Sequence, residues 1–280
     1  MHLIIPLCIA IHSCYIGSKV VISLLALEFG ASQVVIGVIA ALYALVPLVL
    51  GVYSGRLADT IGMRIPLFVG AVLVGSAMLV GHFWHSLSAL FVTASLVGAG
   101  FVFFNVSIQN LTGTHGSPEQ HVRNFSLLSI GYSTSTFIGP MVAGFVIDYA
   151  GHAAAFLVFA VFTLLPITVL AVNRNFAKFE GAVNREVKRS AVDLLRMPTV
   201  RRLIIISGLI VAATDLFAFY VPIYAHSSGL TASHIGIILG TYAVAAFVPR
   251  FTLPLMIRRW APDRVLLVAM LVGATGFLAF

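Results

Sequence analysis

Long apolar segments follow one another along this chain, separated by shorter stretches of polar residues. Most of them run for roughly 17–25 residues, the length an α-helix needs to cross a bilayer core of about 30 Å. The pattern predicts an all-α protein, a polytopic transmembrane helix bundle. The expected spans are 3–27, 34–54, 66–82, 88–110, 124–147, 153–173, 202–224, 234–256 and 265–280. The last run stops at Phe280 with no polar end, so we expect the chain to end inside a ninth helix.

Charge supports this interpretation and orients the bundle. Charged residues make up only 9% of the chain, whereas a soluble domain carries about 25%. Every Lys and Arg except Lys19 falls in alternate connections, and the connections near 28–33, 83–87, 148–152 and 225–233 contain none. Because basic residues stay on the cytoplasmic side, the N-terminus is expected in the cytoplasm, and the basic composition indicates membrane orientation and not nucleic-acid binding.

The longest polar stretch divides the chain into three predicted parts. Residues 1–173 would form an N-terminal six-helix bundle, 174–201 a basic cytoplasmic linker, and 202–280 a partial second bundle. An internal repeat favours this division. The segment Gly30-Ala31-Ser32 recurs 199 positions later as Gly229-Leu230-Thr231, each before a similar apolar run. In both copies the small polar residue is expected to cap the next helix, and two parallel halves of this kind are typical of secondary transporters.

The segment between the second and third spans carries the most specific motif. It reads Gly55-Arg56-Leu57-Ala58-Asp59-Thr60-Ile61-Gly62-Met63-Arg64 and resembles the signature loop of the major facilitator superfamily. Gly55 and Gly62 would permit a tight turn, and Asp59 could accept backbone N–H groups and pair with an arginine. The resemblance implies a conformational latch made by Gly55, Asp59, Gly62 and Arg64. Thr60 and Met63 stand where that family usually has basic residues.

The fifth span carries a second resemblance, from Ser135 to Gly144, to the G-x-x-x-G-P-x-x-G-G motif of antiporters in this family. Ser135 and Gly139 belong to a line of small residues four apart that lets another helix approach closely. Pro140 permits a bend. The resemblance implies export, although plain helix packing would explain the same small residues. The arginine of proton antiporters in the fourth span is replaced by Ala94.

Ionisable residues inside apolar spans are expensive in lipid and indicate a cavity. Lys19 lies in the first span and shares one helix face with His12 and Tyr15. Asp215 lies midway along the seventh span, the repeat partner of the first. The sequence therefore predicts that Asp215 takes and releases a coupling proton and that Lys19 contributes charge to substrate binding. A static ion pair, or a Lys19 that extends to the interface, would explain the same residues.

Other polar residues extend the predicted cavity. Asn105 and Gln109 lie one turn apart on the fourth span, Tyr132 lies on the fifth, and Tyr43 and Tyr242 occupy equivalent positions of the two repeats. Hydrogen bonds between helices are the alternative role for each. Cys8 and Cys14 lie in one apolar span on different faces, which indicates filler and not a metal site. No cofactor is expected.

Together these features predict an alternating-access secondary transporter for a small molecule, most simply a proton-coupled exporter. Proton-coupled metabolite uptake and a non-transporting receptor or scaffold of the same fold remain alternatives. An enzyme is disfavoured because no H-E-x-x-H or G-x-S-x-G motif occurs. The expected partners are the lipid bilayer, a small-molecule substrate and protons, and the protein is expected to be monomeric in a bacterial inner membrane.

Overall fold

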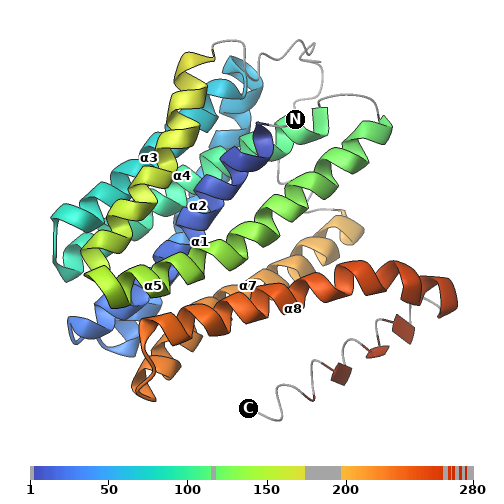
Figure 1. The fold of residues 1–280 in the computed structure, drawn as a ribbon. Coiled ribbons are helices and arrows are strands. Elements are labelled where there is room, and N and C mark those ends of the chain that lie inside the picture. The colour runs from blue at the N-terminus through green and yellow to red at the C-terminus, as the bar shows by residue number, and fades with distance from the viewer. Residues whose placement is uncertain are drawn as a thin grey trace. The chain divides into compact units, whose positions relative to one another are not determined.

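The computed structural model describes residues 3–114, 118–173 and 197–260, with isolated positions between 264 and 275. These residues form helices and no strand: α1 Ile4–Glu28, α2 Gln33–Ile61, α3 Arg64–Phe83, α4 Leu87–Thr114, α5 Pro118–Val172, α7 Pro198–Ser227 and α8 Ala232–Arg259. The chain divides into two compact units, Met1–Gly240 and Thr241–Phe280. The site described below lies within the first unit, which holds α1 to α7 and the start of α8 (Figure 1).

The predicted spans correspond to these helices, and six of the described helices are long and apolar enough to cross a membrane. The largest difference is at the end of α2, which continues to Ile61. The predicted turn at Gly55 is therefore wrong, because Gly55 is helical and is followed by the good helix formers Arg56, Leu57 and Ala58. The turn comes at Gly62, where φ is 84°.

The polar stretch after the sixth span is only partly described. Residues 174–196 lie outside the described part of the chain, as does most of the predicted ninth span. Helix α7 begins at Pro198, so the last residues assigned to the linker belong to a helix. The proposed division at 173 and 201 stays a prediction.

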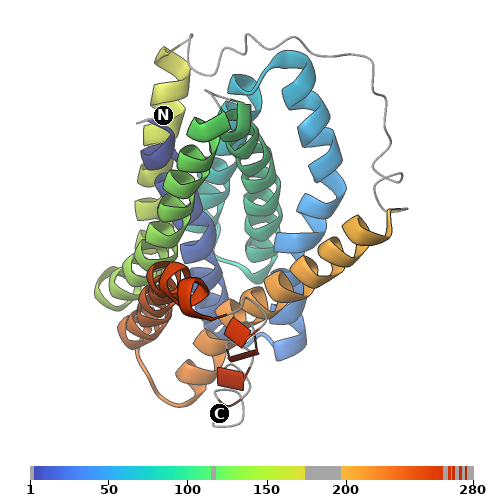
Figure 2. The ribbon, with the colours of Figure 1, turned by 90° about the vertical axis from the view of Figure 1, so that its right-hand side faces the viewer.

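Two predicted spans fall within α5. Its non-helical residue is Gly151, with φ 83° and ψ 171°, a backbone conformation that glycine adopts without the strain of a Cβ. The two halves of α5 run antiparallel from this point (Figure 2). The break thus separates the fifth and sixth spans, and Pro140 lies within the helix of the fifth span.

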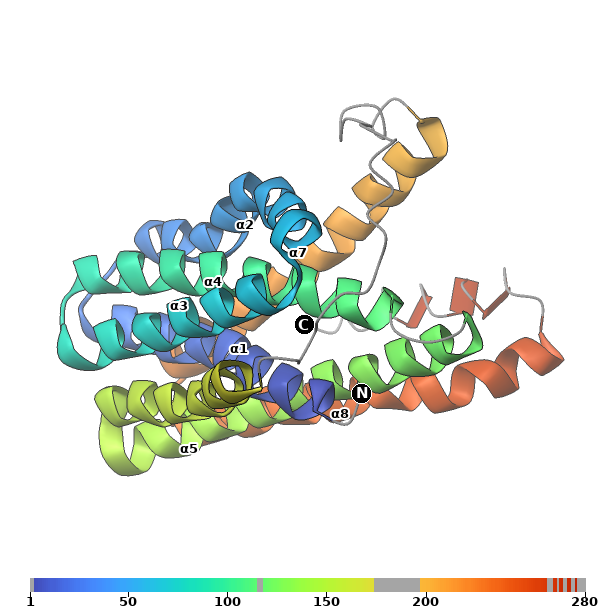
Figure 3. The same cartoon turned by 90° about the horizontal axis from the view of Figure 1, so that it is seen from above.

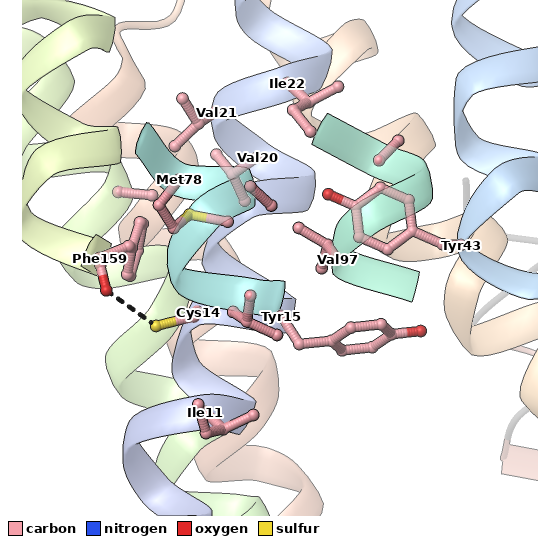
Figure 4. Close-up of a cluster of buried hydrophobic side chains, with 14 of the residues drawn as sticks. Ile11, Cys14, Tyr15, Val20, Val21, Ile22, Tyr43, Met78, Val97 and Phe159 are labelled. Atoms are coloured by element: carbon pink, nitrogen blue, oxygen red, sulfur yellow. Dashed lines mark hydrogen bonds between the residues drawn. The ribbon is translucent and has the colours of Figure 1, made fainter. Parts of the chain in front are cut away.

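Helix α1 lies at the centre of this unit, with α5 along one side and α4 along another (Figure 3). It is buried along nearly its whole length, including the polar residues Ser13, Ser18 and Lys19. Figure 4 shows its apolar neighbours, where the Cys14 thiol donates a hydrogen bond to the carbonyl oxygen of Phe159 at 3.2 Å. A helix enclosed by protein on all sides can carry a charge that lipid would not tolerate.

Glycines allow the closest helix crossings. A side chain at Gly70 of α3 would place its Cβ 2.6 Å from the carbonyl oxygen of Gly100 in α4. At Gly139 of α5 the Cβ would lie 2.8 Å from the carbonyl oxygen of Ser13 in α1. The backbones therefore touch directly at these crossings, as in other membrane bundles.

The internal repeat also appears in the geometry of the turns. Gly30 and Gly229 both have positive φ, 69° and 81°, where α1 and α7 end. The hydroxyl of Ser32 then accepts a hydrogen bond from the N–H of Val35 at 3.4 Å. The Thr231 hydroxyl accepts one from the N–H of His234 at 3.5 Å. The predicted caps are confirmed in both copies.

Candidate substrate and ion-coupling site

The two charges predicted within the membrane spans meet. The Nζ atom of Lys19 in α1 donates a hydrogen bond to Oδ1 of Asp215 in α7 at 2.6 Å. The Lys19 side chain is fully buried, whereas that of Asp215 is 36% exposed. One end of the pair is thus sealed inside the helix bundle and the other is open to an adjoining space.

Three aromatic rings surround the Lys19 ammonium. Its Nζ atom lies 4.3 Å from the ring centroid of Tyr15, 5.5 Å from that of Tyr43 and 5.6 Å from that of Phe219. Each distance is within the range of about 6 Å over which a ring face attracts a cation. We call Tyr15, Tyr43 and Phe219 the aromatic cage. With the Asp215 carboxylate, it offers negative potential to an ammonium from several sides.

Four other predicted polar residues form a second cluster beside the cage. Tyr132 of α5 donates a hydrogen bond to Oδ1 of Asn105 in α4 at 2.5 Å, and Gln109 also interacts with the Tyr132 side chain. The ring of His12 lies 4.9 Å from that of Tyr132 and 6.1 Å from that of Tyr15. The His12 ring therefore connects the two clusters along one face of α1.

A pocket of about 340 Å³ opens next to the ion pair, between α2 and α7. Asp215 and Phe219 form part of its wall together with small and apolar residues such as Gly37, Ala40 and Ile223. Asp215 is the charged residue among those that line it. The volume is in the range of small-molecule sites, which are mostly apolar with a few polar groups.

The signature loop behaves differently from the prediction. Asp59 accepts a hydrogen bond from Asn110 at 3.5 Å. Neither the Lys19–Asp215 ion pair nor the Glu28–His152 contact, the two acid–base contacts found among the described residues, includes it. Arg64 instead donates to the carbonyl oxygen of Leu170 from both Nε and Nη2, at 2.9 and 2.6 Å. It thereby caps the C-terminal end of α5, where carbonyl groups favour a cation.

The antiporter-like residues face two different helices. Ser135 and Gly139 lie against α1, and the Ser135 hydroxyl bonds to the carbonyl oxygen of Ile9 at 3.4 Å. Gly144 and Pro140 lie against α8, where a Cβ on Gly236 would come 2.7 Å from the Pro140 carbonyl oxygen. The expected close approach of another helix is thus observed twice.

Sequence reasoning missed two important residues. Phe219 lies one turn after Asp215, so its place on the same face of α7 could have been inferred from the spacing. For Asp148, the spacing gives no such indication of its partner. Its carboxylate accepts hydrogen bonds from the N–H groups of Ala232 and Ser233 at 3.0 and 2.7 Å, at the start of α8. It thereby links the end of the fifth span to the eighth.

The described residues contain no group of three or more His, Cys, Asp or Glu side chains able to hold a metal ion. Cys8 and Cys14 are buried free thiols. The groups present at the site are an ion pair, aromatic rings, and amide and hydroxyl groups.

The sequence profile of the Major Facilitator Superfamily matches residues 7–280. The chain belongs to this superfamily. It is 27% identical over 90% of its length to the staphylopine export protein of Staphylococcus aureus. It is 24% identical over 83% to multidrug resistance protein 1 of Bacillus subtilis, and 23% identical over 66% to the vesicular acetylcholine transporter of Drosophila melanogaster. These matches cover 66%, 60% and 32% of the relatives' own lengths.

Solved structures show the same fold. The chain is similar to a POT family transporter in complex with a thioalcohol-conjugated peptide, with a TM-score of 0.59 and 17% identity over 93% of this chain and 53% of the other. A peptide transporter POT in complex with sulfate gives 0.58, with 17% identity over 96% and 55%. The described helices thus share the fold of these structures, and membership of the superfamily together with the apolar helices makes this an integral membrane protein. The relatives named above are export or transport proteins.

Proposed function

We propose that this superfamily member is a proton-coupled exporter of small organic molecules that works by alternating access. Asp215 is the group that takes up and releases the coupling proton, and Lys19 is its counter-ion at the substrate site. The observation that carries the proposal is the 2.6 Å ion pair between α1 and α7. An isolated charge in a membrane span is costly, so a buried pair retained there indicates a functional role.

The pair can respond to a proton in a simple way. Protonation of Asp215 neutralises the carboxylate and leaves the Lys19 ammonium without its opposite charge. The attraction between α1 and α7 then weakens, because a charge-assisted hydrogen bond is roughly twice as strong as a neutral one. The exposed side of Asp215 gives the proton a route from the adjoining pocket. Loading and unloading of this carboxylate can therefore bias the contact between the two helices.

The direction of transport is proposed from the relatives. The name of the staphylopine export protein refers to export, and that of multidrug resistance protein 1 refers to drug resistance. Both relatives are bacterial, which supports a location in a bacterial inner membrane. The distribution of Lys and Arg supports a cytoplasmic N-terminus. We further propose that the transporter acts as a monomer in the bilayer, with a small molecule and protons as its partners.

The test is flux in proteoliposomes that contain the full chain and a pH-sensitive dye, with organic cations and metabolites as candidate substrates. We expect substrate movement in one direction to drive protons in the other, and Asp215→Asn to abolish both. Glu28→Gln, which removes an exposed acid outside the site, is the matched control and should retain flux. Co-directional movement of substrate and protons would replace export with uptake.

A charge swap separates proton coupling from a static ion pair. The double variant Lys19→Asp with Asp215→Lys restores opposite charges between α1 and α7, and we expect it to recover the thermal stability lost in Asp215→Asn. We do not expect it to recover proton-coupled flux, because the carboxylate then lies on the buried side of the pair. Full recovery of flux by the swap would reduce the pair to a structural role and overturn the assignment of Asp215.

A further inference from the structure

The aromatic cage is built independently of the lysine that occupies it. The Tyr15 ring stacks on Phe101 at 3.8 Å between centroids and with 16° between planes. The hydroxyl of Tyr43 shares a hydrogen bond with that of Ser18 at 2.8 Å. The Tyr43 ring in turn contacts Tyr15 and Phe219, each at 5.5 Å and 67°. The rings are therefore held by one another and by their neighbours, and an ammonium group other than that of Lys19 would find the same surfaces.

The cage also has an entrance that favours a cation. The pocket between α2 and α7 reaches Asp215 and Phe219 directly, while Lys19 lies behind them and is fully buried. A solute in the pocket therefore meets a carboxylate and a ring before it meets the ammonium. A carboxylate solute would be repelled by Asp215 and by the negative ring faces. An organic ammonium with an apolar body would match both the charge and the apolar wall.

We propose that Asp215 and the aromatic cage recognise the ammonium group of the transported molecule, and that Lys19 is a tethered competitor which occupies this site when substrate is absent. The inference rests on the proposed function, in that the pocket holds a transported small molecule. Arrival of the substrate ammonium at Asp215 displaces Lys19 from the carboxylate. The Asp215 carboxylate is therefore always neutralised, whether by substrate, by a proton or by Lys19.

Competition by Lys19 predicts that replacing this residue strengthens ligand binding. Removing a side chain from a binding site normally weakens binding, whereas removing a competitor strengthens it. We expect Lys19→Met to bind the probe benzyltrimethylammonium about tenfold more tightly than the unchanged protein, which corresponds to about 1.4 kcal/mol. Binding is measured by calorimetry on the full chain in lipid nanodiscs. Benzoate is the carboxylate probe of similar size, and neither protein is expected to bind it.

The rings are tested without touching the charges. Phe219→Leu keeps an apolar side chain but removes the ring face, and we expect it to weaken benzyltrimethylammonium binding by about tenfold, as cation–π contacts in desolvated sites do. Tyr53→Leu removes an aromatic ring from the exposed face of α2 and is the matched control. It should leave the affinity unchanged. Equal affinities in the Phe219 variant and this control would show that the cage does not recognise the ammonium.

The outcomes distinguish this inference from the proposed function. Binding of benzoate, or weaker binding of the ammonium in Lys19→Met, would overturn the inference while proton-coupled flux of another substrate class could persist. Tight ammonium binding without any proton movement would uphold the inference and overturn proton coupling. If Lys19→Met fails to fold, the conservative variant Lys19→Arg provides a second test of competition. It keeps the charge in the site and should bind the probe no more tightly than the unchanged protein, so tighter binding would contradict competition.

Discussion

The link between Asp148 and α8 gives a prediction that can be worked from the structure. The first N–H groups of a helix have no partner within it, and the Asp148 carboxylate satisfies two of them at the start of α8, with bonds of 3.0 and 2.7 Å. Asp148 belongs to α5, so this contact joins the fifth and eighth spans at one membrane face. In the alternating access proposed above, the helices at this face separate, and the bonds break when they do.

The free-energy cost of losing the Asp148 carboxylate follows from its role as a helix cap. Loss of a capping side chain costs a helix about 1 kcal/mol, within a range of about 0.5–2 kcal/mol. Asp148 is exposed, so screening by water keeps the charge contribution at the low end. A change of about 1 kcal/mol alters a two-state population about fivefold. We therefore expect Asp148→Asn to raise the population that is open at this face about fivefold, and Asp148→Ala to raise it further.

Distance measurements between two spin labels provide the assay. Ala150→Cys near the Gly151 break and Ser228→Cys in the turn before α8 are both exposed, while the native Cys8 and Cys14 are buried and should not react. We expect the long-distance component to grow in Asp148→Asn. Glu28→Gln removes another acid at this face, one that pairs with His152 of α5 and not with α8, and should not change it. Unaltered distance distributions in both Asp148 variants would refute the reasoning.

Four further predictions concern packing and burial. Arg64→Ala removes the bonds to the Leu170 carbonyl oxygen and should lower stability by about 1–2 kcal/mol, seen as a lower Tm in detergent, and an unchanged Tm would contradict the capping role. Gly144→Val should abolish flux because its Cβ would collide with the backbone of α8. Gly55→Ala has open space around it and should raise stability by about 0.5–1 kcal/mol. Retained flux in Gly144→Val would contradict the close contact with α8, and a lower Tm in Gly55→Ala would contradict the open space around Gly55. The Cys14 thiol is fully buried and should react with maleimide only after denaturation, so rapid labelling of the native protein would mean that α1 is accessible.

Much of the fold follows from hydrophobicity, because the bilayer requires apolar runs of a fixed length. The eight spans before residue 260 were predicted this way, and so were the caps at Ser32 and Thr231. The end of α2 was not, because glycine in a helix costs too little to stop it when the flanking residues favour helix. Hydropathy alone could not distinguish the turn at Gly62 from the helical Gly55.

The candidate site was predictable in part for a similar reason. Lys19 and Asp215 stand out because each is a charge in an apolar span, and charges in such spans find partners. The aromatic cage could not be found in this way, since the chain has many aromatic residues and their meeting depends on how α1, α2 and α7 pack. Arg64 shows the same limit. Its motif indicated an ion pair, while the nearest acceptor in the fold is a carbonyl oxygen of another helix.

Helix α5 has glycine on two sides, and this has a mechanical consequence. Gly139 meets the backbone of α1, and Gly144 with Gly236 brings α5 and α8 together backbone to backbone. Interlocked side chains resist separation because they must change rotamer to pass one another, and packed cores switch between discrete arrangements for this reason. At a contact between two glycine backbones, no side chains interlock. Separating α5 from α8 at this contact therefore requires no rotamer change. The hydrogen bonds of Asp148 beside it then determine whether the closed contact is favoured.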